Sequence, residues 1–251
     1  MTPPPGRPRV VLTTVASVDA RIAPSRRERL LDGGVYARWI AAWPPDVHQL
    51  IQQRDQWLAD RYSPTVTVEG SGSFVDDLAV SPWPGTSSRG SVPDHLPRST
   101  PRWFVVIDSR GRIDWRFTGD EETALLVLVC ERTPGGYLAR LRELRVGYLV
   151  AGRDRVDLSL ALVRLRDTLG ADTVIADGGG ALNGAMVRAG LLDELHVITF
   201  PALVGGLDTP SILDGPSLTP GLPIPRLNVA HRVEGSAGST WTRYEVAASG
   251  A

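Results

Sequence analysis

Residues 173–206 read TVIADGGGALNGAMVRAGLLDELHVITFPALVGG, and this stretch decides the fold class. An apolar, strand-like segment ends at Asp177, three glycines follow at positions 178–180, and a helical pattern runs over residues 181–189. A glycine-rich turn between a strand and a helix lets backbone N–H groups approach a diphosphate, with the positive end of the helix dipole facing the anion. The alternative is a close contact between helix and strand without a ligand, because glycine turns are common at such junctions.

Two better-known phosphate motifs are absent from the chain. Gly178, Gly180 and Gly184 do not have the spacing of the G-x-G-x-x-G dinucleotide fingerprint. A Walker A loop needs a lysine, and the sequence contains none, so the 27 residues of the Lys/Arg class are all arginine. The lack of lysine also excludes a Schiff base with pyridoxal phosphate.

The composition narrows the class of protein further. A net charge of -1 argues against a dedicated nucleic-acid or membrane-surface protein, and 42% hydrophobic residues suffice for a sizeable core. The single cysteine, Cys130, excludes an internal disulfide, and the four histidines lack metal-ligand spacing, so no metal site is expected. No apolar run approaches the roughly 18 residues of a membrane span, and the first residues lack the apolar core of a signal peptide. We therefore expect a cytoplasmic protein.

Strand-like and helix-like segments alternate along the chain, which predicts a mainly parallel sheet with helices on both faces. The expected strands are residues 9–17, 65–69, 103–108, 125–130, 146–151, 173–177 and 194–200, followed by an antiparallel pair at 226–235 and 240–247. The expected helices are residues 46–62, 137–144, 158–170 and 181–189. We expect a disordered leader at residues 1–6, a single domain over residues 7–247, and a long loop inside it at residues 81–101.

Six short motifs, in order, carry a resemblance that covers roughly residues 7–246. They are ASVDA at 16–20, EGSGS at 69–73 with Asp76 and Asp77, VIDS at 106–109, DGGGAL at 177–182, GLLDEL at 190–195 and PALVGG at 201–206. The chain resembles the riboflavin-biosynthesis reductase family, which comprises the C-terminal domain of the bifunctional deaminase–reductase and its stand-alone relatives. The resemblance implies a dihydrofolate-reductase-like three-layer α/β sandwich, with a mainly parallel central sheet and a C-terminal antiparallel hairpin. It also implies NADPH as cofactor and a homodimer, for which the strand after Asp193 and Glu194 is a candidate contact.

The resemblance also assigns site residues one by one. The implied cofactor contacts are Ala16, Ser73, Asp77, Ser109, Gly178, Gly179, Gly180, Ala181, Leu182, Asn183 and Gly184. Asp77 has an alternative role as a turn or helix cap. On the substrate side, Arg61 stands in the place of an arginine that holds substrate. Asp177 replaces a glutamate that contacts substrate, and it is the candidate catalytic residue, because the proton comes either from Asp177 or from water.

Two further expectations concern specificity. Arg110 and Arg132 are placed to reach a 2′-phosphate, which favours NADPH over NADH. The family's D-D-P-x-L-T-x-R run is replaced after Asp77 by LAVSPWPG, so the arginine expected on the substrate phosphate is missing. We expect the loop at residues 81–101, which holds Trp83, Arg89 and Arg98, to border the substrate pocket, and the substrate to differ from the phosphorylated riboflavin precursor. In the alternative, Arg89 or Arg98 replaces the lost contact.

These observations predict an NADPH-dependent reductase of a pyrimidine, a pterin or a related nitrogen heterocycle. Hydride would pass to a C=N carbon or an equivalent sugar carbon. The alternative is a non-catalytic nucleotide-binding protein that kept the fold and lost the substrate site. The expected partners are a small-molecule substrate and a second copy of the chain, with no nucleic acid and no membrane.

Overall fold

The structure is a computed structural model, and it describes residues 6–76, 78–85, 92–218, 220–221 and 224–247. The chain divides into two compact units. Unit 1 comprises Met1–Pro8 and Pro64–Val174, and unit 2 comprises Arg9–Ser63 and Ile175–Ala251. The chain therefore leaves unit 2 after Ser63 and returns to it inside the short strand β6 (Thr173–Ala176).

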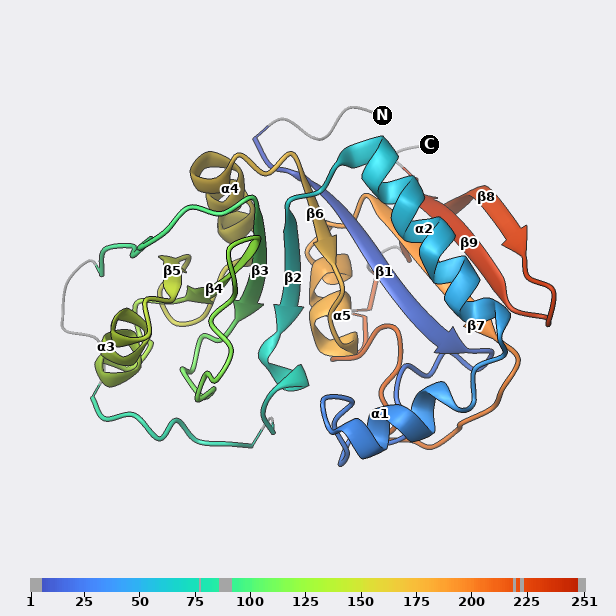
Figure 1. The fold of residues 1–251 in the computed structure, drawn as a ribbon, viewed down its shortest axis with the longest axis horizontal. Helices are drawn as coiled ribbons and strands as arrows, with labels where there is room; N and C mark the ends of the chain where they lie inside the picture. Colours follow the sequence, from blue (N-terminus) through green and yellow to red (C-terminus); the bar gives the residue numbers. More distant parts are fainter. Residues whose placement is uncertain (1–5, 77, 86–91, 219, 222–223, 248–251) are drawn as a thin grey trace. The chain divides into compact units, whose positions relative to one another are not determined.

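Unit 1 is built on a parallel sheet. Its strands pair in the order β2 (Val66–Gly70), β3 (Arg102–Ile107), β4 (Thr123–Val129) and β5 (Gly147–Val150). The 3-10 turn η1 (Ser71–Ser73) follows β2, and the helices α3 (Gly135–Glu143) and α4 (Leu158–Leu169) follow β4 and β5. Since parallel strands end at one edge of a sheet, the loops after β2, β3, β4 and β5 gather there. Figure 1 shows β2 and β3 running in the same direction.

Unit 2 combines parallel and antiparallel pairing. Strand β1 (Arg9–Ser17) is parallel to β7 (Glu194–Phe200), and β7 is antiparallel to β9 (Thr240–Val246). Strand β8 (Leu227–Glu234) pairs with β9, with an irregularity between Val229 and His231. The helices of this unit are α1 (Gly33–Ile40), α2 (Asp46–Tyr62) and α5 (Gly180–Arg188). In Figure 1, α2 lies across β7 and β9, in agreement with the contacts between these elements.

The start of α2 is fixed by a buried carboxylate. Asp46 accepts hydrogen bonds from the backbone N–H groups of Ala237 (2.7 Å) and Ser239 (3.3 Å) and from the Ser239 hydroxyl (2.7 Å). These groups belong to the turn between β8 and β9, so the first turn of the helix and the hairpin are held together. The helix then buries Val47, Leu50 and Leu58.

The predicted fold class is confirmed: the chain is an α/β protein with mainly parallel strands and a C-terminal antiparallel pair. The predicted strands at residues 9–17 and 194–200 and the predicted helix at residues 46–62 have the observed bounds, and each of the other predicted elements differs by one or two residues at one or both ends. The single domain stays a prediction, and residues 1–5 of the expected leader lie outside the described residues. Within the described part of the chain, no helix combines the length and the apolarity needed to cross a membrane.

The sequence analysis missed α1. This helix is short, and it begins with two glycines, which are poor helix formers. It forms because the Asp32 side chain accepts a hydrogen bond from the N–H group of Gly34, and because Trp39 packs edge-on against Phe200 at 5.4 Å between ring centroids. The contact between Trp39 and Phe200 joins residues far apart in the sequence, so no local sequence pattern predicts the helix.

The expectation that β7 forms a subunit contact is wrong for this strand. β7 pairs with β1 on one side and with β9 on the other, and all its residues except Thr199 are buried. Its edges and side chains therefore have no surface to offer a second copy. The homodimer itself stays a prediction.

A buried polar cluster lies at the amino end of β7. The carboxylate of Glu194 is 2% exposed and accepts hydrogen bonds from Arg9 Nη1 (2.9 Å) and from the Tyr62 hydroxyl. His196 Nε2 lies 3.3 Å from the same carboxylate, and Arg243 Nη1 lies 3.8 Å away. Burial acts to raise the pKa of Glu194, but hydrogen bonds from His196 and Tyr62 outweigh it and hold the pKa below its ordinary value. Glu194 therefore joins β1, α2, β7 and β9 as a charged hub.

Replacement of this hub carboxylate tests its role. We expect Glu194→Gln to lower the free energy of unfolding by about 3 kcal/mol at pH 7, because it leaves the Arg9 guanidinium beside a neutral group. The lowered pKa means that the stabilisation is present above the ordinary carboxyl pKa and is lost as the pH falls through the lowered value. The difference between wild type and variant should therefore shrink in acid.

Urea unfolding measures both effects. The matched control is Glu245→Gln on β9, a more exposed carboxylate whose loss should cost no more than about 0.5 kcal/mol. Equal costs for the two variants would show that the Glu194 cluster is not a stability hub.

Candidate functional site

In unit 2, the glycine turn lies between β6 and α5. Strand β6 ends at Ala176, Asp177 follows, and α5 begins at Gly180 with Gly179 as its N-cap. Gly179 has an extended backbone, with φ -70° and ψ 167°, and no side chain caps the helix. The first backbone N–H groups of α5 are therefore left without a side-chain acceptor, which suits an anionic ligand.

The glycines of this turn serve two different purposes. A Cβ at Gly180 would lie 2.2 Å from the Ser211 carbonyl oxygen, and a Cβ at Gly184 would lie 2.0 Å from that of Asp214. These two glycines let the loop around residues 211–214 pack directly on α5. Among the described residues, no atom lies within 4 Å of a Cβ built at Gly179, so these residues leave the space beside it open. The open space at Gly179 fits the diphosphate reading, whereas Gly180 and Gly184 fit the alternative of an internal contact.

Burial differs among the residues of the cofactor set that the family resemblance implied. Gly178, Gly179 and Ala181 remain accessible. The residues with little or no surface are Ala16, Gly180, Leu182, Asn183 and Gly184. Asn183 donates a hydrogen bond to the Ile212 carbonyl (3.0 Å), which makes it an anchor for the packed loop. Packing inside unit 2 accounts for the burial of these five residues, and their direct contact with a cofactor stays a prediction.

Asp177 projects from the end of β6. Its carboxylate accepts a hydrogen bond from the Thr13 hydroxyl (3.2 Å), and its side chain is accessible to solvent. Desolvation raises the pKa of Asp177 above the ordinary value, while the charge of Arg54 and the Thr13 hydrogen bond act to lower it. Asp177 therefore holds a proton to higher pH than an ordinary aspartate, yet a ligand can reach it.

Arg54 is a functional candidate that the sequence analysis missed. It lies on α2 and is 7% exposed, its Nε donates to Asp55 (2.9 Å), and its charge acts on Asp177. The predicted Arg61 lies two turns further along α2, about 10 Å away along the axis. Arg61 is exposed and stacks over Tyr62 at 5.8 Å, at the end of the helix that faces the Glu194 cluster. The structure thus places Arg54, and not Arg61, close to Asp177.

Two of the recognised motifs are joined by one carboxylate. Asp19 of the ASVDA motif accepts hydrogen bonds from the N–H groups of Val204 (3.2 Å) and Gly205 (2.7 Å) of the PALVGG motif. The Ser17 hydroxyl also donates to it (2.6 Å). The Ser17 and Gly205 hydrogen bonds are the largest causes that lower the pKa of Asp19 to about 2. Asp19 therefore ties the loop that carries the ASVDA motif to the loop that carries the PALVGG motif.

In unit 1, the loop after β2 is anchored to the end of β3. Ser73 lies in the η1 turn and is partly exposed, while Asp77 lies outside the described residues. Arg112 donates to the Ser71 hydroxyl (2.6 Å) and to the Asp76 carbonyl (2.8 Å). The fully buried Asp108 accepts from the backbone N–H group of Arg112 (2.6 Å). Asp108, the aspartate of the VIDS motif, is thus a structural anchor for the loop that carries Ser73.

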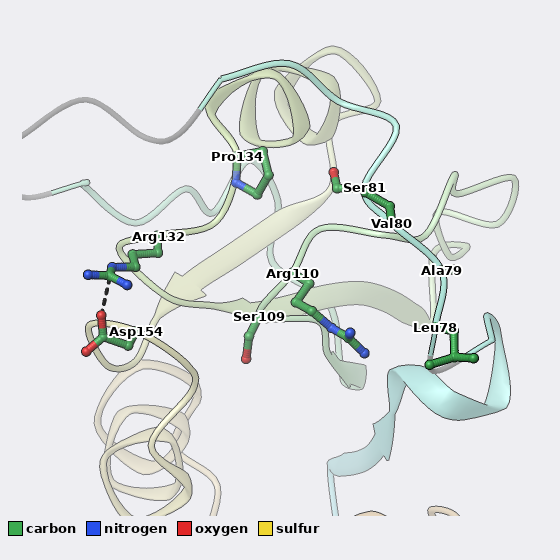
Figure 2. Close-up of a pocket in the computed structure, with 9 residues that line it drawn as sticks. All are labelled: Leu78, Ala79, Val80, Ser81, Ser109, Arg110, Arg132, Pro134 and Asp154. Carbon is green, nitrogen blue, oxygen red and sulfur yellow. Dashed lines mark ion pairs between the residues drawn. The ribbon is translucent and has the colours of Figure 1, made fainter.

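An open pocket of about 380 Å³ lies at the carboxyl ends of the strands of unit 1 (Figure 2). It is lined by residues 78–81, Ser109, Arg110, Arg132, Pro134 and Asp154. The Ser109 hydroxyl oxygen accepts a hydrogen bond from the Val156 N–H group (2.9 Å), so its own hydrogen can be donated to a ligand. Arg132 Nε lies 2.7 Å from Asp154 Oδ1. The pocket therefore brings together Ser109, Arg110 and Arg132, the expected contacts for the phosphorylated ribose.

The loop at residues 81–101 covers another part of unit 1. The Ser81 hydroxyl donates to the Gly111 carbonyl (2.7 Å), and Trp83 packs against Tyr137 at 6.3 Å. Further on, Asp94 accepts from the Val150 N–H group (3.0 Å), and residue 95 bridges to β5. The described parts of the loop therefore cover the β5 edge, while Ser81 at its start lines the pocket, and a substrate pocket beside this loop stays a prediction. Arg89 lies outside the described residues.

These features define a class, namely α/β proteins whose ligand-binding loops follow parallel strands. The sequence matches the model of the RibD C-terminal domain over residues 8–236, and the chain belongs to that family. The predicted family is thereby confirmed.

Known proteins agree with this membership. The chain is 29% identical over 209 residues to the 2,5-diamino-6-ribosylamino-4(3H)-pyrimidinone 5′-phosphate reductase of Methanothermobacter thermautotrophicus, covering 83% of this chain and 85% of that protein. A pyrimidine reductase-like protein from Corynebacterium diphtheriae has the same fold, with a TM-score of 0.65 at 15% identity over 96% of this chain and 92% of that one. Acinetobacter baumannii RibD gives a TM-score of 0.62 at 17% identity over 97% of this chain, which spans only 59% of that longer chain.

Ala20 offers a test of the loop that Asp19 holds. Ala20 has a φ of 62°, in the left-handed region, where the family motif has glycine. A left-handed conformation costs a non-glycine residue about 1–2 kcal/mol, whereas glycine costs about 0.4–1 kcal/mol in unfolded-state entropy. We therefore expect Ala20→Gly to raise the free energy of unfolding by about 0.5–1 kcal/mol in urea titrations.

The control for this variant is Ala42→Gly, at an exposed turn position whose φ is not positive. This variant should lower the free energy of unfolding by a similar amount. If Ala20→Gly destabilises as much as the control, the left-handed strain at Ala20 is absent.

Proposed function

We propose that this protein is an NADPH-dependent reductase of a pyrimidine-like nitrogen heterocycle. The open, uncapped glycine turn directly beside the accessible carboxylate of Asp177 carries the proposal, because it offers an anion site next to a group that can hold a flat ring. Membership of the RibD C-terminal domain family supports a nicotinamide cofactor. A cytoplasmic location stays a prediction.

The residues present fit such a cofactor in each unit separately. In unit 2, the space beside Gly179 and the free N–H groups of α5 suit a diphosphate. In unit 1, the Ser109 hydroxyl suits a ribose oxygen, and Arg110 and Arg132 suit a 2′-phosphate. When bound, the cofactor supplies a hydride, and the protein supplies orientation and exclusion of water.

Asp177 is the proposed substrate and proton-holding residue. A carboxylate can bind the edge of a 2-aminopyrimidine through paired, charge-assisted N–H donors. Desolvation also raises the pKa of this carboxyl group, so its protonated form is reached more easily than that of an ordinary aspartate, which suits a group that gives a proton to the reduced product. The nearby charge of Arg54 limits this rise, and an arginine there also favours an anionic or carbonyl-bearing substrate.

Recognition of a substrate phosphate is the feature most clearly altered. Counting along the family run D-D-P-x-L-T-x-R from Asp76 places its arginine at Trp83. Trp83 packs against the core of unit 1, and the intervening Leu78 and Val80 are 89% and 87% exposed. The Methanothermobacter thermautotrophicus reductase is named for a substrate that carries a 5′-phosphate, and we propose that this protein takes a related substrate without that requirement.

A second candidate function follows from the same observation. A nucleotide-binding protein that lost its substrate site would also lack the phosphate arginine. It would be stabilised by NADPH but would oxidise it with none of the heterocycles tested below. The carboxylate at Asp177, in the place of the family's glutamate, favours the reductase.

Cofactor binding is tested at Gly179. With NADPH at about 100 times its Kd, wild type should gain about 2.7 kcal/mol, or roughly 5–10 °C in Tm. Gly179→Val should keep a folded protein, since nothing occupies the space of its Cβ, but should lose the NADPH shift because the side chain fills the diphosphate position.

Two further variants control this experiment. Gly33→Val, also at an open helix start, should keep the full NADPH shift. Gly180→Val should unfold or lose several degrees in Tm without ligand, because of its clash with the Ser211 carbonyl. A normal NADPH shift in folded Gly179→Val would place the diphosphate elsewhere.

Substrate choice is tested by NADPH oxidation. We compare 2,5-diamino-6-ribosylamino-4(3H)-pyrimidinone 5′-phosphate with its dephosphorylated form and with dihydropterin. A missing charged hydrogen bond costs roughly 1.5–3 kcal/mol, so the phosphate should bring less than the tenfold to hundredfold gain in kcat/KM that an arginine would give. A kcat/KM above about 10⁴ M⁻¹ s⁻¹ for the phosphorylated compound, with a large advantage over the other two, would restore the riboflavin assignment.

Asp177→Asn should lower kcat/KM tenfold to a hundredfold with the best of these substrates, because an amide cannot form two charge-assisted acceptor bonds. The control is Asp208→Asn, an exposed carboxylate in the same unit, which should leave kcat/KM unchanged. Equal effects of the two variants would remove Asp177 from the site.

A further inference from the structure

The carboxylate of Asp154 lines the pocket of unit 1, where its negative charge disfavours the binding of the expected 2′-phosphate. Arg132 and Asp154 form an ion pair at 2.7 Å, with side chains 69% and 59% exposed. Both residues line the pocket with Ser109 and Arg110. Figure 2 shows the two side chains of the pair pointing toward each other, with Ser109 between this pair and Arg110 in that view.

The backbone holds this pair in place. The N–H group of Glu131 donates to the Gly152 carbonyl (3.0 Å), and that of Arg132 donates to the Arg153 carbonyl (3.1 Å). Gly152 has a φ of 116°, and a Cβ there would lie 2.3 Å from the Arg155 carbonyl oxygen. The loops after β4 and β5 are thus tied side by side, and the tight turn presents Asp154 to Arg132 without any contribution from the carboxylate itself.

We propose that Asp154 is a specificity-determining residue that holds the preference for NADPH over NADH below the level that Arg110 and Arg132 would give alone. The proposal rests on the function proposed above. A bound 2′-phosphate competes with Asp154 for the guanidinium group of Arg132. It is also repelled by the negative charge of the Asp154 carboxylate. A ribose with a free 2′-hydroxyl instead finds in Asp154 an acceptor for that hydroxyl, the role that acidic residues play in NAD sites.

The two effects have opposite signs, which separates them from a general change of charge. Asp154→Asn should bind adenosine 2′,5′-bisphosphate and NADPH roughly tenfold more tightly than wild type does, since a repulsion and a competing partner are removed. The same variant should bind 5′-AMP and NADH equally well or up to about threefold more weakly, because an amide is a weaker acceptor for the hydroxyl. The ratio of the two affinities is therefore the decisive quantity.

The experiment measures the four dissociation constants by titration calorimetry, or by competition against NADPH fluorescence. Asp167→Asn is the charge-matched control: it removes an exposed carboxylate of α4 that does not line the pocket, and it should leave the ratio unchanged. Arg132→Ala should weaken binding of the bisphosphate, and adding Asp154→Asn to it should tighten binding by clearly less than in the wild-type background, because only the repulsion remains to be removed. Because the loop contacts are made by backbone groups, Asp154→Asn should unfold at the wild-type temperature.

The outcomes separate this inference from the proposed function. If wild type binds NADPH but Asp154→Asn leaves the ratio unchanged, or improves both classes of ligand by the same factor, the role of Asp154 is overturned and the reductase proposal stands. If wild type binds none of the four ligands, both proposals fall. A shift of the ratio that is equally large in the Arg132→Ala background would also overturn the inference, since none of the effect would run through the ion pair.

Discussion

The close approach of a loop to helix α5 is the constraint on which the rest of unit 2 depends. Gly180 and Gly184 present bare backbone to the carbonyl groups of Ser211 and Asp214, and any side chain there would push the two segments apart. Asn183 closes the contact with its hydrogen bond to Ile212. The loop covers one face of α5, while Gly179 and Ala181 remain accessible. The packing of the loop on α5 therefore also determines the shape of the glycine turn.

Side chains that might be taken for binding groups often prove to organise loops. Asp19 and Asp46 accept hydrogen bonds from backbone N–H groups of distant segments, whereas Asp108 accepts them from Arg112 and Ile113 in the loop just after it. Each of the three aspartates lies in a recognisable motif or at a helix start. A short polar motif that recurs in a family therefore need not touch a ligand. In this protein, the accessible groups are fewer: Asp177 and the start of α5 in unit 2, and the rim of the pocket in unit 1.

The sequence was sufficient where the signal is local or periodic. The strand at residues 194–200, the glycine turn and the position of Asp177 at a strand end all follow from patterns within a few residues. It was insufficient where contacts join distant segments. Spacing counted back from Ser73 predicted Arg61, whose role stays a prediction, and gave no sign of Arg54, whose charge acts on Asp177. Likewise, no local pattern predicts that Trp83, in the loop at residues 81–101, packs against Tyr137.

The interruption of unit 2 by unit 1 has a consequence for synthesis on the ribosome. Strand β1 pairs with β7, so Val11 lies opposite Glu194, and the two partners leave the ribosome far apart in time. At a translation rate of about 5–20 residues per second, β1 waits roughly 10–40 s for its neighbour. The parallel strands of unit 1 are synthesised during that time and can pair among themselves. The apolar first strand is therefore the segment most in need of protection while the chain is still growing, and chaperones that bind nascent chains would find their target there.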